Sequence, residues 1–125
     1  MHSDSFIAEI SCPKDWGQKH VGIWFSDGRV AHCARRRGEH ISTIDEFAAG
    51  HDVTIERMVP LHEHAATLAR IAEAMRSPKA YDIVNNNCEM FVRRMLGEKV
   101  ESPQLQGAIL VIGLAAVLGL AAARS

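Results

Sequence analysis

The sequence predicts one compact domain that combines β-strands with α-helices and is followed by an apolar C-terminal segment. Two β-rich runs, residues 20–25 and 30–34, flank a Ser-Asp-Gly turn that is typical of a β-hairpin. Two further segments, residues 60–76 and 88–96, have the apolar spacing of amphipathic helices. The stretch from residue 102 to residue 123 contains no charged residue. We therefore divide the 125 residues into a globular domain, 1–101, and an apolar tail, 102–125.

Composition excludes several classes of protein. Lys and Arg total 14 and Asp and Glu total 15, so the formal charge is -1 and no basic excess indicates binding to nucleic acid. The three cysteines (Cys12, Cys33 and Cys88) are an odd number without a CxxC pair, which favours a reducing compartment over a disulfide framework. The first residues lack a basic region and a long apolar run, so we expect no cleavable secretion signal.

The hairpin sorts its side chains onto two faces. A three-residue loop, Ser26 to Gly28, pairs Phe25 with Arg29, Trp24 with Val30, Gly22 with His32 and His20 with Ala34. One face is then apolar, and the other carries both histidines: the first holds Val21, Ile23, Phe25, Ala31 and Cys33, and the second His20, Gly22, Trp24, Val30 and His32. A two-residue Asp-Gly loop would instead separate the histidines. We favour the three-residue loop because its apolar sorting is cleaner.

The other elements follow from local signals. Residues 1–19 read as a polar lead-in with a short apolar patch at 6–8 and a turn near 13–17. Residues 35–38 are expected to form a basic solvent-exposed loop, with contact to anionic lipid headgroups as a second role. A capped helical turn begins near 42 and ends near 50, and a strand is predicted over 53–59. Pro60 opens a helix to about 76, with a buried stripe made of Leu61, Leu68, Ile71 and Met75, and 81–84 is short and extended.

The start of the last helix carries the strongest chemical signal. Asn86 followed by Glu89 fits a reciprocal N-terminal cap, and Cys88 then heads an apolar stripe with Phe91, Val92, Met95 and Leu96. Free N–H groups and the helix dipole at this position favour a thiolate, which a nucleophilic cysteine needs. The alternative is that Cys88 is a small core residue of an amphipathic helix.

The two hairpin histidines can complete such a site. Cysteine chemistry needs an imidazole that takes and returns the proton, and a polar group that orients this imidazole. His20 and His32 share one face as diagonal neighbours, and Gly22 leaves the space for an imidazole pair. By contrast, His62 and His64 flank Glu63 at a helix start, where alternate residues diverge, so we expect no metal site there.

The segments H-V-G-I-W-F-x-D-G-x-V-x-H (20–32) and N-C-E-x-F-V (87–92) together resemble the lecithin–retinol acyltransferase-like family, which includes the small H-Rev-type phospholipase/acyltransferases. The likeness covers roughly residues 15–97. It implies a circularly permuted papain-like (NlpC-like) α+β domain with an antiparallel sheet. It also implies Cys88 as the nucleophile, His20 as the general base and His32 as the polar third member. Met90 stands where the family usually has a histidine, and it leaves the Cys88 stripe.

The resemblance implies a reaction in two steps without a cofactor or a metal. Cys88 would take an acyl group from a phospholipid ester as a thioester and pass it to an amine, an alcohol or water. Two other classes stay open. One is a papain-like cysteine peptidase or amidase on the same fold, and the other is a catalytically silent membrane-binding module.

The apolar tail predicts a membrane anchor. Residues 105–123 would extend roughly 28 Å as a helix, enough for a thin hydrocarbon core, although a buried helix of the domain is an alternative. Arg93, Arg94 and Lys99 precede the segment and only Arg124 follows it, which predicts a single-pass, tail-anchored membrane protein with a cytoplasmic catalytic domain. The tail carries a stripe of small residues suited to helix–helix self-association, namely Ala115, Gly119 and Ala123.

Overall fold

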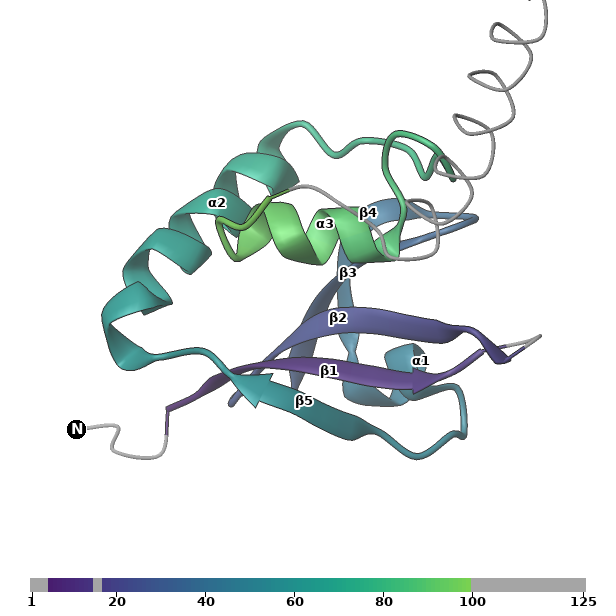
Figure 1. The fold of residues 1–125 in the computed structure, drawn as a ribbon, viewed down its shortest axis with the longest axis horizontal. Coiled ribbons are helices and arrows are strands. Elements are labelled where there is room, and N and C mark those ends of the chain that lie inside the picture. Colours follow the sequence, from purple (N-terminus) through teal and green to yellow (C-terminus); the bar gives the residue numbers. More distant parts are fainter. Residues whose placement is uncertain (1–4, 15–16, 100–125) are drawn as a thin grey trace, which may run out of the picture.

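A computed structural model describes residues 5–14 and 17–99, which form an α+β fold with a five-stranded antiparallel sheet in the order β4-β3-β2-β1-β5 (Figure 1). The strands are β1 (Ile7–Pro13), β2 (Lys19–Phe25), β3 (Arg29–Ala34), β4 (Gly38–Thr43) and β5 (Thr54–Met58). The helices are α1 (Ile44–Ala48), the short 3₁₀ turn η2 (Leu61–Glu63), α2 (His64–Arg76) and α3 (Cys88–Met95).

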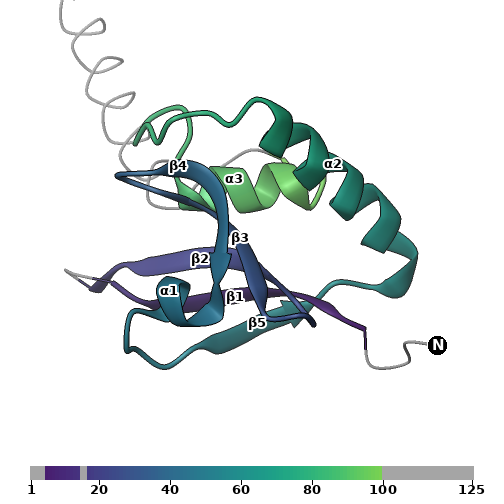
Figure 2. The same ribbon diagram turned by 180° about the vertical axis from the view of Figure 1, so that it is seen from behind.

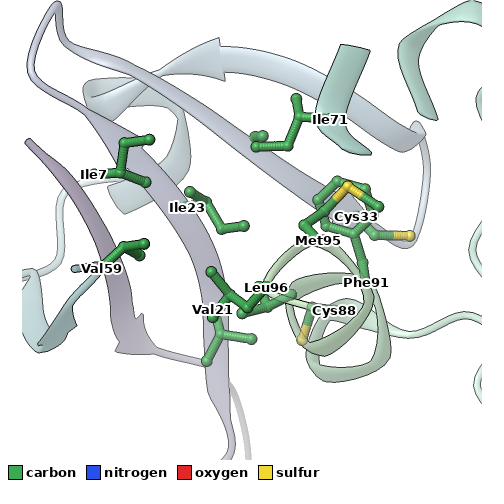
Figure 3. Close-up of a cluster of buried hydrophobic side chains, with 12 residues drawn as sticks. Ile7, Val21, Ile23, Cys33, Val59, Ile71, Cys88, Phe91, Met95 and Leu96 are labelled. Carbon is green, nitrogen blue, oxygen red and sulfur yellow. The ribbon is translucent and has the colours of Figure 1, made fainter. Parts of the chain in front are cut away.

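Helices cover the sheet from two sides. Helices α2 and α3 lie over one face, whereas α1 lies on the other side (Figures 1 and 2). The larger core cluster fills the space under α2 and α3, where Val21, Ile23 and Cys33 meet Phe91 and Met95 (Figure 3). A smaller cluster occupies the opposite face and consists of Ala8, Ile10, Cys12, Val30 and Phe47. The two-faced sorting predicted for the hairpin is therefore confirmed.

The hairpin turn has the expected geometry, but its strands separate early. Ile23 pairs with Ala31 and Trp24 with Val30, and the N–H of Gly28 donates to the carbonyl of Phe25 at 2.9 Å. Gly28 has a φ of 94°, the left-handed conformation that the three-residue loop requires. The two pairs expected beyond this point, at residues 22/32 and 20/34, are not formed between the described strands. At this end of the hairpin the chain around α3 contacts both strands: the Cys88 sulfur lies 4.0 Å from the Lys19 carbonyl of β2, and the Cys33 thiol of β3 donates to the Asn86 carbonyl at 3.5 Å.

Two strands lacked the signals used to predict strands. We expected a polar lead-in at β1, but β1 is flanked by β2 and β5 and is buried on both faces, including Ser11 and Cys12. A strand covered on both faces has no alternation of polar and apolar residues. We expected a loop and then a helical turn at β4, but residues 38–43 pair along the whole length of β3. The strand predicted over 53–59 is confirmed as β5, an edge strand with all five residues exposed.

One expectation for the helices and their neighbouring segments is confirmed, and three are wrong. The capped turn is confirmed as α1, where the Oγ1 of Thr43 accepts from the N–H of Glu46 at 3.2 Å. Regular α2 begins at His64 rather than Pro60, and the predicted stripe is wrong for Leu61 and Leu68, which are 78% and 48% exposed. Residues 81–84 are not extended but belong to a turn that Asp82 and Asn86 close by two backbone hydrogen bonds.

The predicted tail lies outside the described residues. Within residues 5–14 and 17–99, no helix is long and apolar enough to cross a membrane.

Candidate active site

Helix α3 begins at Cys88, with Asn87 as its N-cap. The Oδ1 of Asn87 accepts from the N–H of Met90 at 2.9 Å. The cap predicted at Asn86 is therefore wrong by one residue, because the buried Asn86 amide has other partners. It donates to the Oε2 of Glu39 at 2.9 Å, and the same buried carboxylate pairs with Arg94. This network fixes the chain on the N-terminal side of the cysteine.

The Cys88 sulfur lies against the backbone on both sides of His20. The predicted stripe is buried as expected, and Cys88 itself is 6% exposed. Its Sγ is 4.0 Å from the carbonyl oxygen of Lys19 and is also hydrogen-bonded by the backbone of Val21. Figure 3 shows Cys88 at the start of α3 beside Val21. These two residues flank His20 in β2, so the fold brings the sulfur to the backbone beside His20, while the described residues form no hydrogen bond between the thiol and the imidazole.

Burial dominates the acidity of the Cys88 thiol. Loss of solvation raises its pKa, and this effect outweighs the backbone hydrogen bond from Val21 and the positive charge of Lys14. The helix start does lower the pKa through the backbone hydrogen bond of Glu89, as expected, but burial outweighs this effect in the resting protein. The proton stays on sulfur at neutral pH, so a nucleophilic role requires a base that removes it as the sulfur attacks.

The two predicted histidines are in direct contact. The Nε2 of His20 is 2.9 Å from the Nδ1 of His32, and the Nε2 of His32 is 2.8 Å from the Oγ of Ser42. Ser42 was not predicted as a site residue, because the sequence pattern assigned Ser42 to the start of a helical turn rather than to β4. Its only local signal is its place in the β-branched and polar run before Asp45. That signal does not indicate contact with a histidine ten positions earlier.

His20 is held as a neutral ring with one free nitrogen. Burial is the main cause that lowers the pKa of His20 to about 4 and that of His32 to about 3, so both rings are uncharged at pH 7. The His20 ring stacks on Phe47 with a centroid distance of 4.8 Å. Its Nδ1 is buried and has no hydrogen-bond partner in the described part of the chain, the Cys88 sulfur included.

The role of Gly22 differs from the expected one. A Cβ at this position would lie 2.8 Å from the Cε2 of Phe47 and 2.8 Å from the Cγ1 of Val30. The glycine therefore makes room for Phe47 rather than for an imidazole pair. Since Phe47 stacks on His20, Gly22 still supports the site, but indirectly. Met90 is half-buried and does not belong to the buried stripe, in agreement with the helical spacing.

A hollow of about 380 Å³ lies next to residues that contact the Cys88 sulfur, although neither Cys88 nor His20 forms part of its wall. Lys19 and Val21, which contact the sulfur, form part of its wall, together with Glu89 of the first turn of α3. The rest of the wall consists of Glu9, Gly17, Glu56, Val92 and Arg93. A reactant in this hollow would be next to the residues that surround Cys88.

No known protein family, curated protein or solved structure matches the chain. The resemblance to the lecithin–retinol acyltransferase-like family stays a prediction that rests on the two motifs and on the contacts described above.

Proposed function

We propose that the chain is a membrane-anchored, cysteine-dependent acyltransferase and phospholipase A-type hydrolase, with a circularly permuted papain-like (NlpC-like) fold. One observation carries the proposal. The Nδ1 of the neutral His20 ring is buried without a partner, and the Cys88 sulfur contacts the backbone on both sides of that residue. We assign the proton transfer to Nδ1, because Nε2 is already bound to His32.

The chemistry follows from this arrangement. His20 Nδ1 takes the proton of Cys88 as Sγ attacks the carbonyl carbon of a phospholipid ester. The C–O bond then breaks, the leaving alkoxide receives the proton from His20, and an acyl-thioester remains on Cys88. An amine, an alcohol or water next gives its proton to His20 and attacks the thioester. The thiolate leaves, regains the proton and restores the enzyme.

Backbone N–H groups at the start of α3 are candidates for stabilising the oxyanion. The Asn87 cap already occupies the N–H of Met90, and the N–H of Glu89 is hydrogen-bonded to the Cys88 sulfur, which leaves the N–H of Cys88. Each such donor is typically worth about 3–4 kcal/mol in the transition state.

Several surface features favour a lipid over a peptide substrate. Ile83 and Val84 are 61% and 51% exposed at the tip of the turn that precedes α3. The Oδ1 of Asp82 holds this tip by accepting from the N–H of Val84 at 2.9 Å. The exposed basic turn 35–37 adjoins Gly38, which packs on the carbonyl of Lys79, in the segment that leads into the turn preceding α3. An apolar tip and a basic turn together are complementary to an anionic phospholipid surface.

The tail completes this arrangement. Residues 105–123 would anchor the chain in the bilayer as a single helix with the catalytic domain on the cytoplasmic side. Because the substrate would be confined to the same surface, anchoring raises its effective concentration. Ala115, Gly119 and Ala123 would allow two such helices to pack together.

The test uses the full chain in vesicles of mixed-chain phosphatidylcholine. We expect release of fatty acid and, after rapid quenching, an acyl adduct on the peptide that contains Cys88. Cys88→Ala and His20→Gln should abolish both signals. Cys33→Ala is the matched control, because Cys33 is also buried near α3 but is not assigned a chemical role. Cleavage of peptide substrates without an acyl adduct would contradict the proposal, as would an adduct on Cys12 or Cys33.

A further inference from the structure

Ser42 contacts His32, the second member of the histidine pair. It belongs to β4, is 7% exposed, and contacts the Nε2 of the 4% exposed His32 at 2.8 Å. The same Oγ is 3.1 Å from the backbone carbonyl of Thr43, to which it donates. Three polar side chains, of which Ser42 and His32 are buried and His20 is half-buried, thus form one chain of hydrogen bonds from Ser42 through His32 to His20.

The number of available protons determines which group donates in each of these hydrogen bonds. A hydroxyl group has one proton, and Ser42 donates it to the Thr43 carbonyl, so its Oγ accepts from the Nε2–H of His32. A neutral His32 that carries its proton on Nε2 has a lone pair on Nδ1. His20 must then donate to it from Nε2–H, which leaves the lone pair of His20 on Nδ1.

The opposite direction would disable the site. If Ser42 donated to His32, then His32 would donate from Nδ1 to the Nε2 of His20. The proton of His20 would then sit on Nδ1, the nitrogen that faces no partner in the described chain. Such a ring cannot accept a proton from Cys88 through that nitrogen, and a buried N–H would be left unpaired.

We propose that Ser42 is a positioning residue, which fixes the tautomers of His32 and His20 so that His20 presents an unprotonated Nδ1. The catalytic meaning of this assignment rests on the proposed function, whereas the tautomers themselves do not. His40 pairs with His32 across β3 and β4, but its Nδ1 is bound to the Gly38 carbonyl at 2.8 Å and its ring makes a tilted contact with His32, with the centroids 4.2 Å apart, so we do not assign it this task.

The experiment reads the ring nitrogens by NMR of the full chain, labelled with ¹⁵N-histidine and held in detergent micelles. For the unaltered chain at pH 7 we expect Nε2 protonated and Nδ1 unprotonated in both rings. Ser42→Ala should mix the tautomers of both rings, and Ser42→Thr, which keeps the hydroxyl, should restore the pattern. Ser11→Ala is the matched control, because it removes another buried strand hydroxyl that bonds to Glu56 and not to a histidine.

The outcomes separate this proposal from the proposed function. A proton on the Nδ1 of His20 in the unaltered chain would overturn the assignment of Ser42 before any variant is made. Unchanged tautomers in Ser42→Ala would overturn it as well, and Ser42→Cys gives the same comparison if the alanine variant does not fold. With phospholipid, Ser42→Ala should lower kcat by about 10–100-fold at unchanged KM, as for other residues that orient a reacting side chain. If the tautomers behave as expected but no acyl adduct forms on Cys88, the proposed function fails and the assignment of Ser42 stands.

Discussion

Alkylation of Cys88 by iodoacetamide should follow the pH profile of an ordinary buried thiol. Burial raises the pKa of Cys88 above its usual value of 9.0, so at pH 7 the thiolate is at most about 1% of the population. The rate should therefore rise about tenfold for each pH unit between pH 6 and pH 9. A resting ion pair of thiolate and imidazolium would instead give a constant rate over the acidic range.

The assay follows the Cys88 peptide of the full chain by mass spectrometry at several pH values. Cys33 gives an internal comparison, because burial raises its pKa to about 12 and its side chain is 0% exposed, so it should react more slowly still. The perturbation is His20→Gln. It should leave the slope of the Cys88 profile unchanged while abolishing acyl transfer, because His20 acts during attack and not at rest. A rate plateau between pH 5 and pH 7 that disappears in His20→Gln would refute this reasoning.

Three further predictions concern the full chain in mild detergent. Gly22→Ala should lower the free energy of unfolding by about 1–2 kcal/mol, since overpacking against Phe47 outweighs the gain from a more restricted unfolded chain. Asn87→Ala should cost about 1 kcal/mol through loss of the α3 cap, as measured by chemical denaturation. Unfolding at pH 5 should take up close to two protons, which His20 and His32 bind, because their pKa values in the folded chain are lowered from 6.5 to about 4 and about 3. Stability from these two groups is complete above pH 6.5 and is lost as the pH falls toward 3, which proton-uptake measurements on unfolding would detect.

Each of these predictions has a distinct control. Gly22→Ala should cost less in a Phe47→Leu background, and an equal cost in both backgrounds would show that the contact does not matter. Asn87→Ser keeps a capping oxygen and should remain close to the unaltered chain. His20→Gln should reduce the proton uptake by about one, and an unchanged uptake would mean that His20 is not a buried neutral ring.

Sequence patterns correctly predicted those parts of the fold that are determined by residues close together in the chain. The spacing of Ser26 to Gly28 gave the hairpin loop, and the period from Cys88 to Leu96 gave the buried face of α3. The patterns failed where long-range packing decides. Strand β1 lacks alternation because both of its faces are buried. The cap moved from Asn86 to Asn87 because a carboxylate 47 positions earlier, on Glu39, binds the Asn86 side chain.

In the candidate site, too, the sequence predicted features set by local spacing but not those set by long-range packing. The spacing within β2 and β3 placed His20 and His32 on one face, but it does not reveal that the start of α3 packs against the backbone beside His20. That packing buries Cys88, and burial reverses the pKa shift expected from a helix terminus alone. The packing that brings the sulfur to the backbone beside His20 therefore also keeps the thiol protonated at rest. If Cys88 is the nucleophile that we propose, it needs a base with a fixed lone pair, and the hydrogen bonds from Ser42 through His32 to His20 would fix one.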